Sequence, residues 1–474
     1  MKFYKILFLL NIVIVFACKK NETQVSDSIN GSWNSIGSGW ILKIEDSTSY
    51  SIYDITSQSC IKRRTGKFNE IEESVDLKDD TLSLKKGVIT YSFTKAENLP
   101  GLCSEEIEMT KLKDPIYNFE VFAETVAEHY AFMDANNINW SNLYSIQKNK
   151  LKKSSSDAEL YIVIQETLDK LNDNHAYLEA PDNVYEEVER LSEETDSGKN
   201  NELQQYGDFV VANMVSKYYL EKDMTKDSWL LQWGKLNDTI GYIQIKAMWL
   251  YADLKIPEDL IEKKGYVNAY VETFHKLYEG DYIEKEVTGV SRIMEKAMND
   301  LSLLDAIILD VRFNGGGQDA VSFEILSHFI PDTIQVAKQK MKYGNKESQV
   351  LPLFIRGKPN AYTKPVYVLT SNETGSAAEA FSLATLKMQN VKRIGARTSG
   401  AMSTALEKKL PNGWDFSISN EIYMDNDGRN YENIGIPVDF KLNYPEDRQV
   451  FFRSVVNDLE RDKKDILNAI QKLN

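Results

Sequence analysis

Residues 306–317 read Ala-Ile-Ile-Leu-Asp-Val-Arg-Phe-Asn-Gly-Gly-Gly, and this stretch decides the fold class. Its first half is a continuous apolar run, which is typical of a strand buried on both faces of a parallel sheet. Residues 365–370, Pro-Val-Tyr-Val-Leu-Thr, have the same character. Helical patterns at about 259–300 and 377–389 accompany these runs. Strands that alternate with helices predict a layered α/β core.

Changes of pattern divide the chain into segments. Alternating apolar and polar residues predict a small antiparallel β domain. After Asp114-Pro115 the apolar spacing becomes helical, and the capping-box pair Ser156 and Glu159 begins a second helix. The predicted segments are a signal peptide at 1–17, a lipidated Cys and tether at 18–30, the β domain at 31–112, a helical subdomain at 114–180, an acidic helical linker region at 181–235, the α/β core at 236–445 and a C-terminal helix at 446–474.

The amino terminus carries the pattern of an export signal. Lys2 and Lys5 precede an apolar run from Ile6 to Ala17, which is too short to span a bilayer. Cys18 follows, and the junction resembles a bacterial lipoprotein box, which implies cleavage before Cys18 and lipidation of its thiol. An ordinary signal peptide that contains a Cys is the alternative. We therefore expect an exported, lipid-anchored protein of the periplasm or cell envelope.

Charge and cysteine usage exclude some classes of function. A formal net charge of −15 disfavours nucleic acid as a partner, because phosphate backbones would be repelled. Cys60 and Cys103 remain after Cys18, and an oxidising compartment favours a disulfide between them; two buried thiols are the alternative. No Cys and His cluster has zinc spacing, so we expect neither a metal nor a cofactor.

Two segments could support chemistry on a carbonyl group. Ser376 lies between a turn that contains Gly375 and a helix that begins at Ala377. The unpaired N–H groups and the dipole of a helix start favour negative charge, so the Ala377 N–H could hold an oxyanion formed by attack of Ser376. An N-cap role for Ser376 is the alternative. The glycines at 315–317 also suit an oxyanion hole, and no Gly-Lys-Ser/Thr follows to make a phosphate loop.

Histidine is scarce in this chain, which has four. His129, His275 and His328 lie in helical patterns, where a packing or surface role is the ordinary one. His175 alone lies in a polar turn after a helix. A neutral imidazole near pH 7 is the natural general base for a serine hydroxyl.

Together these motifs resemble the tail-specific (C-terminal-processing) serine protease family. The stretches that carry the resemblance are Asp310-Val-Arg-Phe-Asn-Gly-Gly-Gly, Thr370-Ser-Asn-Glu-Thr-Gly-Ser-Ala-Ala-Glu and Tyr431-Glu-Asn-Ile-Gly-Ile-Pro-Val-Asp, in the order of the family, with Leu171-Asn-Asp-Asn-His upstream. The similarity covers about 115–445. It implies a layered α/β core of the crotonase and Clp-protease type, a β-α superhelix.

The resemblance also implies a division of roles. The tail-specific branch places a Lys where this chain has Ala401, so the tricorn-core branch, with a Ser-His-Glu type of site, is the better match. Carried over, the roles are Ser376 as nucleophile, His175 as general base and acid, Glu432 behind the His through an intervening polar group, and the N–H groups of Gly316 and Ala377 as oxyanion donors. Glu421 is an alternative to Glu432, and Asn174 replaces the Ser that this branch has before its His.

The resemblance implies a serine endopeptidase that cuts peptides or unfolded exported proteins. Residues 181–235 lack a Gly-Leu-Gly-Phe-like carboxylate loop, so we expect no functional PDZ domain there. One alternative is a non-catalytic lipoprotein that binds a ligand or peptide on the same scaffold, since a fold does not guarantee catalysis. Another is a structural lipoprotein whose function lies in the β domain.

Overall fold

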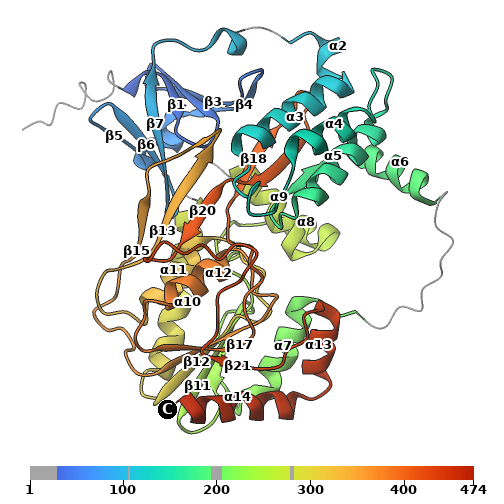
Figure 1. The fold of residues 1–474 in the computed structure, drawn as a ribbon. Coiled ribbons are helices and arrows are strands. Elements are labelled where there is room, and N and C mark those ends of the chain that lie inside the picture. The colour runs from blue at the N-terminus through green and yellow to red at the C-terminus, as the bar shows by residue number, and fades with distance from the viewer. Residues whose placement is uncertain (1–28, 105–106, 194–204, 278–281, 474) are drawn as a thin grey trace, which may run out of the picture.

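A computed structural model describes residues 29–104, 107–193, 205–277 and 282–473. The predicted signal peptide at 1–17 and the predicted lipid-bearing Cys18 lie outside these residues. Within them, no helix combines the length and the apolar character that a membrane crossing requires. The chain forms an N-terminal sheet and a helical part that lie together above an α/β core (Figure 1).

The N-terminal sheet has seven antiparallel strands in the order β4-β3-β2-β1-β7-β6-β5. Their bounds are β1 Gly31–Ser35, β2 Trp40–Glu45, β3 Ser49–Ile55, β4 Cys60–Lys67, β5 Val75–Lys78, β6 Thr81–Lys86 and β7 Ile89–Ala96. Leu82 and Leu84 of β6 are buried between more exposed neighbours, because successive side chains of a strand point to opposite faces. A disulfide joins Cys60, at the start of β4, to Cys103.

The helical part lies beside this sheet. Its helices are α2 Met109–Leu112, α3 Pro115–His129, α4 Trp140–Lys148, α5 Asp157–Leu171 and α6 Asp182–Glu193. The predicted capping box is present at the start of α5, where Ser156 and Glu159 each accept the backbone N–H of the other. The helix ends at Asn172, whose left-handed φ of 52° turns the chain towards His175.

The α/β core is built on a second seven-stranded sheet, in the order β21-β17-β16-β12-β11-β10-β9. The strands are β9 Lys222–Asp223, β10 Leu231–Lys235, β11 Ile240–Ile245, β12 Ala306–Asp310, β16 Val366–Thr370, β17 Val391–Gly395 and β21 Phe440–Lys441. β12 is buried throughout and pairs in parallel with β11 and β16. The buried parallel strand predicted at 306–310 is confirmed.

Helices cover both faces of the central sheet. They are α7 Asp208–Tyr219, α10 Tyr282–Leu301, α11 Asp319–Ser327, α12 Ala377–Thr385, α13 Arg448–Val456 and α14 Leu459–Leu473. Ile307 and Leu309 of β12 belong to the core that holds α10, α11 and α12. Ile308 packs on the other side, with α7, α13 and α14. This is the layered α/β arrangement that the alternation of strands and helices predicts.

Three predicted boundaries differ from the structure. The central sheet begins before residue 236, because β9 and β10 pair antiparallel within the segment expected to be a helical linker. β10 is short, with five residues, and it contains Gly234. Glycine is needed there because a Cβ would lie 2.0 Å from the carbonyl oxygen of Lys222 in the paired strand β9. The stretch at 259–300 holds α8 Glu258–Lys264, α9 Tyr266–Leu277 and α10, since Gly265, with φ 77°, ends α8. The C-terminal segment holds two helices, α13 and α14.

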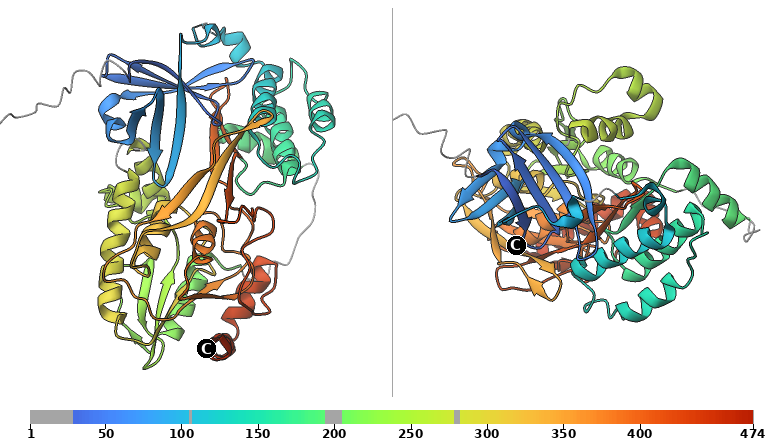
Figure 2. Two further views of the ribbon diagram at one scale, coloured as in Figure 1. Left: turned by 60° about the vertical axis from the view of Figure 1, so that its left-hand side comes forward. Right: turned by 90° about the horizontal axis from the view of Figure 1, so that it is seen from above.

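Two small sheets connect the core with the upper parts (Figure 2). One joins β13 Ile334–Tyr343 with β14 Lys346–Glu347, β15 Leu351–Ile355 and β20 Glu421–Met424; the other joins β18 Ala405–Lys409, β19 Asp415–Ser419 and β8 Tyr177–Glu179. β8 pairs with β19, which ties the helical part to the core. Arg63 of β4 forms a 2.6 Å ion pair with Glu407 of β18, which ties on the N-terminal sheet.

Candidate active site

Ser376 lies at the start of α12, at the end of the turn that follows β16. Its φ of 51° and ψ of −124° are unusual for a residue with a side chain, which costs of order 1–3 kcal/mol. Ser376 occupies the N-cap position of α12, but its hydroxyl makes no capping bond to the helix. Instead Ser376 Oγ lies 3.1 Å from Nε2 of His175, which is distant in sequence. The two residues are within hydrogen-bond reach of each other.

The turn that carries His175 is held against β19 by the carboxylate of Asp173. The Asp173 oxygens accept the N–H of His175 at 2.9 Å, and the N–H and hydroxyl of Ser419 at 2.7 Å each. The Ser417 hydroxyl also donates to the His175 carbonyl oxygen. These four hydrogen bonds hold the His175 turn against the β18–β19–β8 sheet, because both serines belong to β19.

Burial lowers the pKa of His175, and the carboxylate of Asp173 opposes the shift. The imidazole is therefore neutral at pH 7, and Nε2 can accept the Ser376 proton. Among the described residues, Nδ1 of His175 has no hydrogen-bond partner. Glu432 therefore makes no direct hydrogen bond to the ring in this structure.

The glycine loop after β12 lies against Ser376. Gly375 N–H donates to the Asn314 carbonyl oxygen at 3.1 Å, which joins the two turns. Gly316 has φ 115°, and a Cβ there would lie 2.5 Å from the Ser376 Cβ and 3.0 Å from the Ala377 nitrogen. Glycine at 316 therefore leaves open the space in front of the Ala377 N–H, which has no acceptor among the described residues.

The role predicted for the Gly316 N–H differs from the structure. This N–H donates to Oδ1 of Asn314 at 2.9 Å, so it is engaged within its own loop. The physical reason is that an Asn side-chain oxygen readily accepts a hydrogen bond from the backbone N–H two residues later in a turn. Ala377 keeps the predicted geometry of an oxyanion donor, whereas Gly316 provides room.

Glu432 holds the loop that follows Ala401. Its carboxylate accepts the N–H of Met402 at 2.8 Å and of Ser403 at 3.1 Å. Ala401 in turn accepts the Ser376 N–H through its carbonyl oxygen at 2.9 Å. Glu432 thus lies one loop away from the serine. Glu421 contacts the same loop through its backbone N–H, which donates to Ser403 Oγ at 3.2 Å, and its carboxylate accepts a hydrogen bond from Tyr91 of the N-terminal sheet at 3.0 Å.

Glu379 is a functional candidate to which the sequence assigned no role. It is fully buried in α12 and accepts hydrogen bonds from the hydroxyls of Thr398 and Ser399 and from the N–H groups of Gly400 and Ala401. Those bonds shape the loop whose Ala401 carbonyl receives the Ser376 N–H. The spacing Ser-x-x-Glu marks this residue in the sequence, but spacing alone does not show what its carboxylate holds.

The acidic groups around this loop make stability depend on pH. Burial raises the pKa of Glu432 to about 8, with the charges of Glu379 and Asp173 adding to the effect. A raised carboxyl pKa contributes stability that is present at low pH and is lost as the pH rises through the folded-state value.

We expect the thermal midpoint to fall between pH 7 and pH 9, and the Glu432→Gln variant to show a smaller fall. The difference in unfolding free energy over this range is about 1 kcal/mol for one such group. Thermal unfolding followed by circular dichroism measures it. If the thermal midpoints of the wild-type chain and of Glu432→Gln fell equally, Glu432 would not be the cause of the pH dependence.

Comparisons with known proteins assign a family to part of the α/β core. The family model described as Peptidase family S41 matches residues 239–442. Residues 239–442 form a peptidase family S41 domain. Of the predicted site, Ser376, Glu432, Gly316 and Ala377 lie within the matched residues. His175 lies upstream of them and reaches Ser376 across the β8–β19 pairing.

The relatives show how far the S41 similarity extends. The carboxy-terminal processing protease CtpA of Bacillus subtilis (strain 168) is 26% identical over 203 residues, which are 41% of this chain and 40% of that protein. The chain thus matches less than half the length of this curated relative. A candidate peptidase from Parabacteroides merdae ATCC 43184 has a similar fold, with a TM-score of 0.51, 19% identity and coverage of 73% of this chain and 97% of its own. Mature CPAF has a TM-score of 0.50 at 11% identity, with coverage of 76% and 98%.

Within the described residues, no group of three or more His, Cys, Asp or Glu side chains is arranged to hold a metal ion. The contact between Ser376 Oγ and His175 Nε2 supports nucleophilic attack by an activated serine.

Proposed function

We propose that this chain is a serine peptidase that hydrolyses peptide bonds in peptides or unfolded exported proteins through an acyl-enzyme on Ser376. The observation that carries the proposal is the 3.1 Å contact between Ser376 Oγ and His175 Nε2, at the start of a helix in an S41 domain. This contact favours the peptidase over the non-catalytic binding lipoprotein, because a binding site needs no aligned base.

The proposed mechanism uses groups already in contact. Nε2 of His175 takes the proton of Ser376 as Oγ attacks the carbonyl carbon of the scissile bond. The Ala377 N–H stabilises the oxyanion that forms. His175 then gives the proton to the leaving amine, and water hydrolyses the acyl-enzyme in the same way. Glu432 and Glu379 hold the 398–403 loop against Ser376.

Replacement of Gly316 tests the oxyanion site. In Gly316→Ala the new Cβ crowds Ser376 and blocks the approach to the Ala377 N–H, so we expect kcat for peptide hydrolysis to fall by about 100-fold or more. Gly315→Ala is the matched control, because a Cβ there meets nothing within 4 Å. Similar kcat values for both variants would argue against this oxyanion site.

Digestion of a protein substrate tests the proposed substrate class. The wild-type chain is incubated with a reduced, carboxymethylated protein and with the same protein in its folded state, and the products are identified by mass spectrometry. We expect cleavage of the unfolded form at least about tenfold faster, since a peptidase needs an extended segment at the serine. No cleavage of either form would count against the peptidase.

We further propose that the protein is exported and anchored in the bacterial cell envelope by a lipid on Cys18. The apolar run before Cys18 supports this, and so does the disulfide between Cys60 and Cys103, since disulfides persist in oxidising compartments and are rare in the cytosol.

A further inference from the structure

The guanidinium of Arg312 is buried where the loop after β12 meets the C-terminal helices. It forms one ion pair with Asp310 at 2.6 Å and another with Asp462 of α14 at 2.7 Å. The Tyr444 hydroxyl accepts a hydrogen bond from Arg312 at 2.9 Å and donates one to the Asp462 carboxylate at 3.1 Å. The Tyr219 hydroxyl also donates to Asp462, at 2.5 Å. The three charges are thus paired and hydrogen-bonded, as their burial requires.

The backbone at Arg312 supports the turn that carries Ser376. The Arg312 carbonyl oxygen accepts the Ser371 hydroxyl at 2.5 Å, and the Val311 carbonyl oxygen accepts the Thr374 hydroxyl at 2.9 Å. Both hydroxyls belong to the turn between β16 and Ser376. The glycine loop follows directly in the sequence and lies against the serine. A shift of the Arg312 backbone would therefore move the nucleophile turn and the glycine loop together.

The next residue of the loop, Phe313, is held by α13. Its ring stacks on Phe451 with the ring centroids 5.6 Å apart, and it meets Phe452 edge-on at 5.8 Å. All three rings are buried. Both α13 and α14 follow residue 442, where the match to the S41 family model ends. Helices outside the matched residues therefore fix two consecutive residues of the loop, one through charge and one through packing.

The two carboxylates that pair with Arg312 differ in what they can fix. Asp310 lies two residues before Arg312 in the same loop, so it sets the local shape of the loop. Asp462 lies 150 residues later in the chain, so it sets where the loop lies relative to the rest of the core. Guanidinium donors point in fixed directions, which makes such a contact sensitive to geometry. Apolar packing of similar volume would stabilise the core as well, but without this directional restraint.

We propose that Asp462 is a positioning residue for the reaction at Ser376. By holding the Arg312 guanidinium, it fixes the loop at 311–317 and, through that loop, the turn that carries the nucleophile. Asp462 acts on the reaction only through Arg312. The inference rests on the proposed peptidase function, and it extends the working site to a helix outside the S41 match.

A cavity of about 500 Å³ gives small molecules access to this cluster. It lies between β21 and the helices α13 and α14, and both Tyr444 and Asp462 line it. In Asp462→Ala, formate can therefore reach the place of the missing side chain. Because formate is a carboxylate, it can restore the partner that the Arg312 guanidinium has lost.

The test measures kcat and KM for a fluorogenic peptide, at a temperature at which each variant is folded by circular dichroism. For Asp462→Ala we expect kcat to fall by about tenfold or more with KM within about twofold, because misplaced groups slow the chemical step without weakening substrate binding. Sodium formate should restore much of the lost kcat, and sodium chloride at the same ionic strength should not. A purely structural role for Asp462 would lower the thermal midpoint and leave kcat of the folded protein unchanged.

Tyr444→Phe provides a milder change of the same cluster. It keeps Asp462 and removes the hydroxyl that lies between this carboxylate and Arg312. We expect kcat to fall by about threefold or more, again without a change in KM. Removal of one partner of a buried ion pair is strongly destabilising. If Asp462→Ala does not fold, Tyr444→Phe therefore decides the test.

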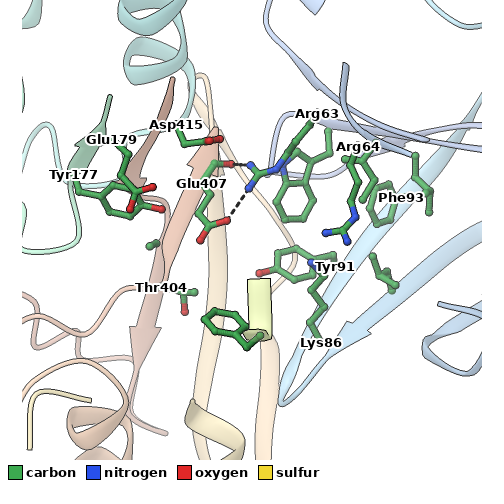
Figure 3. A pocket seen from close by; sticks show the side chains of 16 residues that line it. Arg63, Arg64, Lys86, Tyr91, Phe93, Tyr177, Glu179, Thr404, Glu407 and Asp415 are labelled. Carbon is green, nitrogen blue, oxygen red and sulfur yellow. Dashed lines mark hydrogen bonds and ion pairs between the residues drawn. The ribbon is translucent and has the colours of Figure 1, made fainter. Parts of the chain in front are cut away.

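Glu407→Gln is the matched control, because it also removes a carboxylate from an ion pair between distant segments. Figure 3 shows Glu407 of β18 paired with Arg63 of β4, at 2.6 Å. Both residues lie outside the loop at 311–317 and outside the turn before Ser376. We expect a lower thermal midpoint for Glu407→Gln, with kcat unchanged and no response to formate.

Three results would overturn the inference. They are a kcat within about twofold of the wild-type value in the folded variants of the Arg312 cluster, an equal loss of kcat in Glu407→Gln, and equal effects of formate and chloride on Asp462→Ala.

Hydrogen exchange separates this inference from the proposed function, because it needs no turnover. Amide exchange followed by mass spectrometry should be faster at 311–317 in Asp462→Ala and Tyr444→Phe than in the wild-type chain. If the wild-type chain cleaves no peptide, the peptidase falls, and faster or unchanged exchange decides whether Asp462 positions the loop. If the wild-type chain cleaves peptides and both variants match it in kcat and in exchange, the peptidase stands and this inference falls.

Discussion

Replacing Ser376 with alanine is expected to lower kcat for peptide hydrolysis by about 10⁴- to 10⁶-fold. The acyl-enzyme needs the Ser376 oxygen, and no other hydroxyl contacts His175 Nε2 among the described residues. The fold should remain, because the hydroxyl makes no capping bond to α12 and alanine fits the same space. A fluorogenic peptide measures kcat, and thermal unfolding measures stability.

Ser382→Ala is the matched control for this loss. Ser382 lies in the same helix, but its hydroxyl donates to the Ala378 carbonyl oxygen at 2.8 Å inside the core. Its replacement should cost about 1 kcal/mol of stability and leave kcat within a few-fold. A Ser376→Ala protein that still cleaves peptide within tenfold of the wild-type rate would contradict the assignment of the nucleophile.

Replacing His175 with alanine is expected to lower kcat/KM by about 10³- to 10⁵-fold, since the serine then lacks its base. His328→Gln is the control: His328 lies after α11, 3.6 Å from Glu324, and should affect stability alone. Retained activity in His175→Ala would show that another group takes the Ser376 proton.

The pH dependence of peptide hydrolysis by the wild-type chain also tests whether His175 is the base. Burial lowers the pKa of His175 from its ordinary value of 6.5. The imidazole therefore stays neutral at pH 6.5 and becomes protonated only at a lower pH. Activity should therefore be full at pH 7 and fall only as the pH drops through the lowered value. A profile that falls already above pH 6.5 would mean that His175 is not the titrating base in the free enzyme.

The layered core could be predicted because its strands are buried on both faces and therefore read as unbroken apolar runs, as at 306–310. β9 and β10 could not, since the edge strand β9 has only two residues and β10, a short strand of sequence LQWGK, shows no unbroken apolar run. Their place in the sheet depends on pairing with β11, which is a tertiary contact. The disulfide partners were predictable only because two Cys remained to be paired.

At the site, residue types and order were enough to select Ser376, His175 and Ala377. They did not show which oxygen each N–H meets. Thus the Gly316 N–H is taken by Asn314 within its own loop, and Glu379, seen only as part of a motif, organises the loop beside the serine. Asp173 was missed for the same reason: its contacts with Ser419 join segments far apart in the sequence.

Covalent labelling shows whether Ser376 is the activated nucleophile. The wild-type chain is treated at pH 7 with a serine-directed fluorophosphonate and digested, and the modified residue is identified by tandem mass spectrometry. We expect one phosphonylated serine, Ser376, with labelling strongly slowed in His175→Ala. Absence of labelling at Ser376, or equal labelling rates with and without His175, would contradict this assignment.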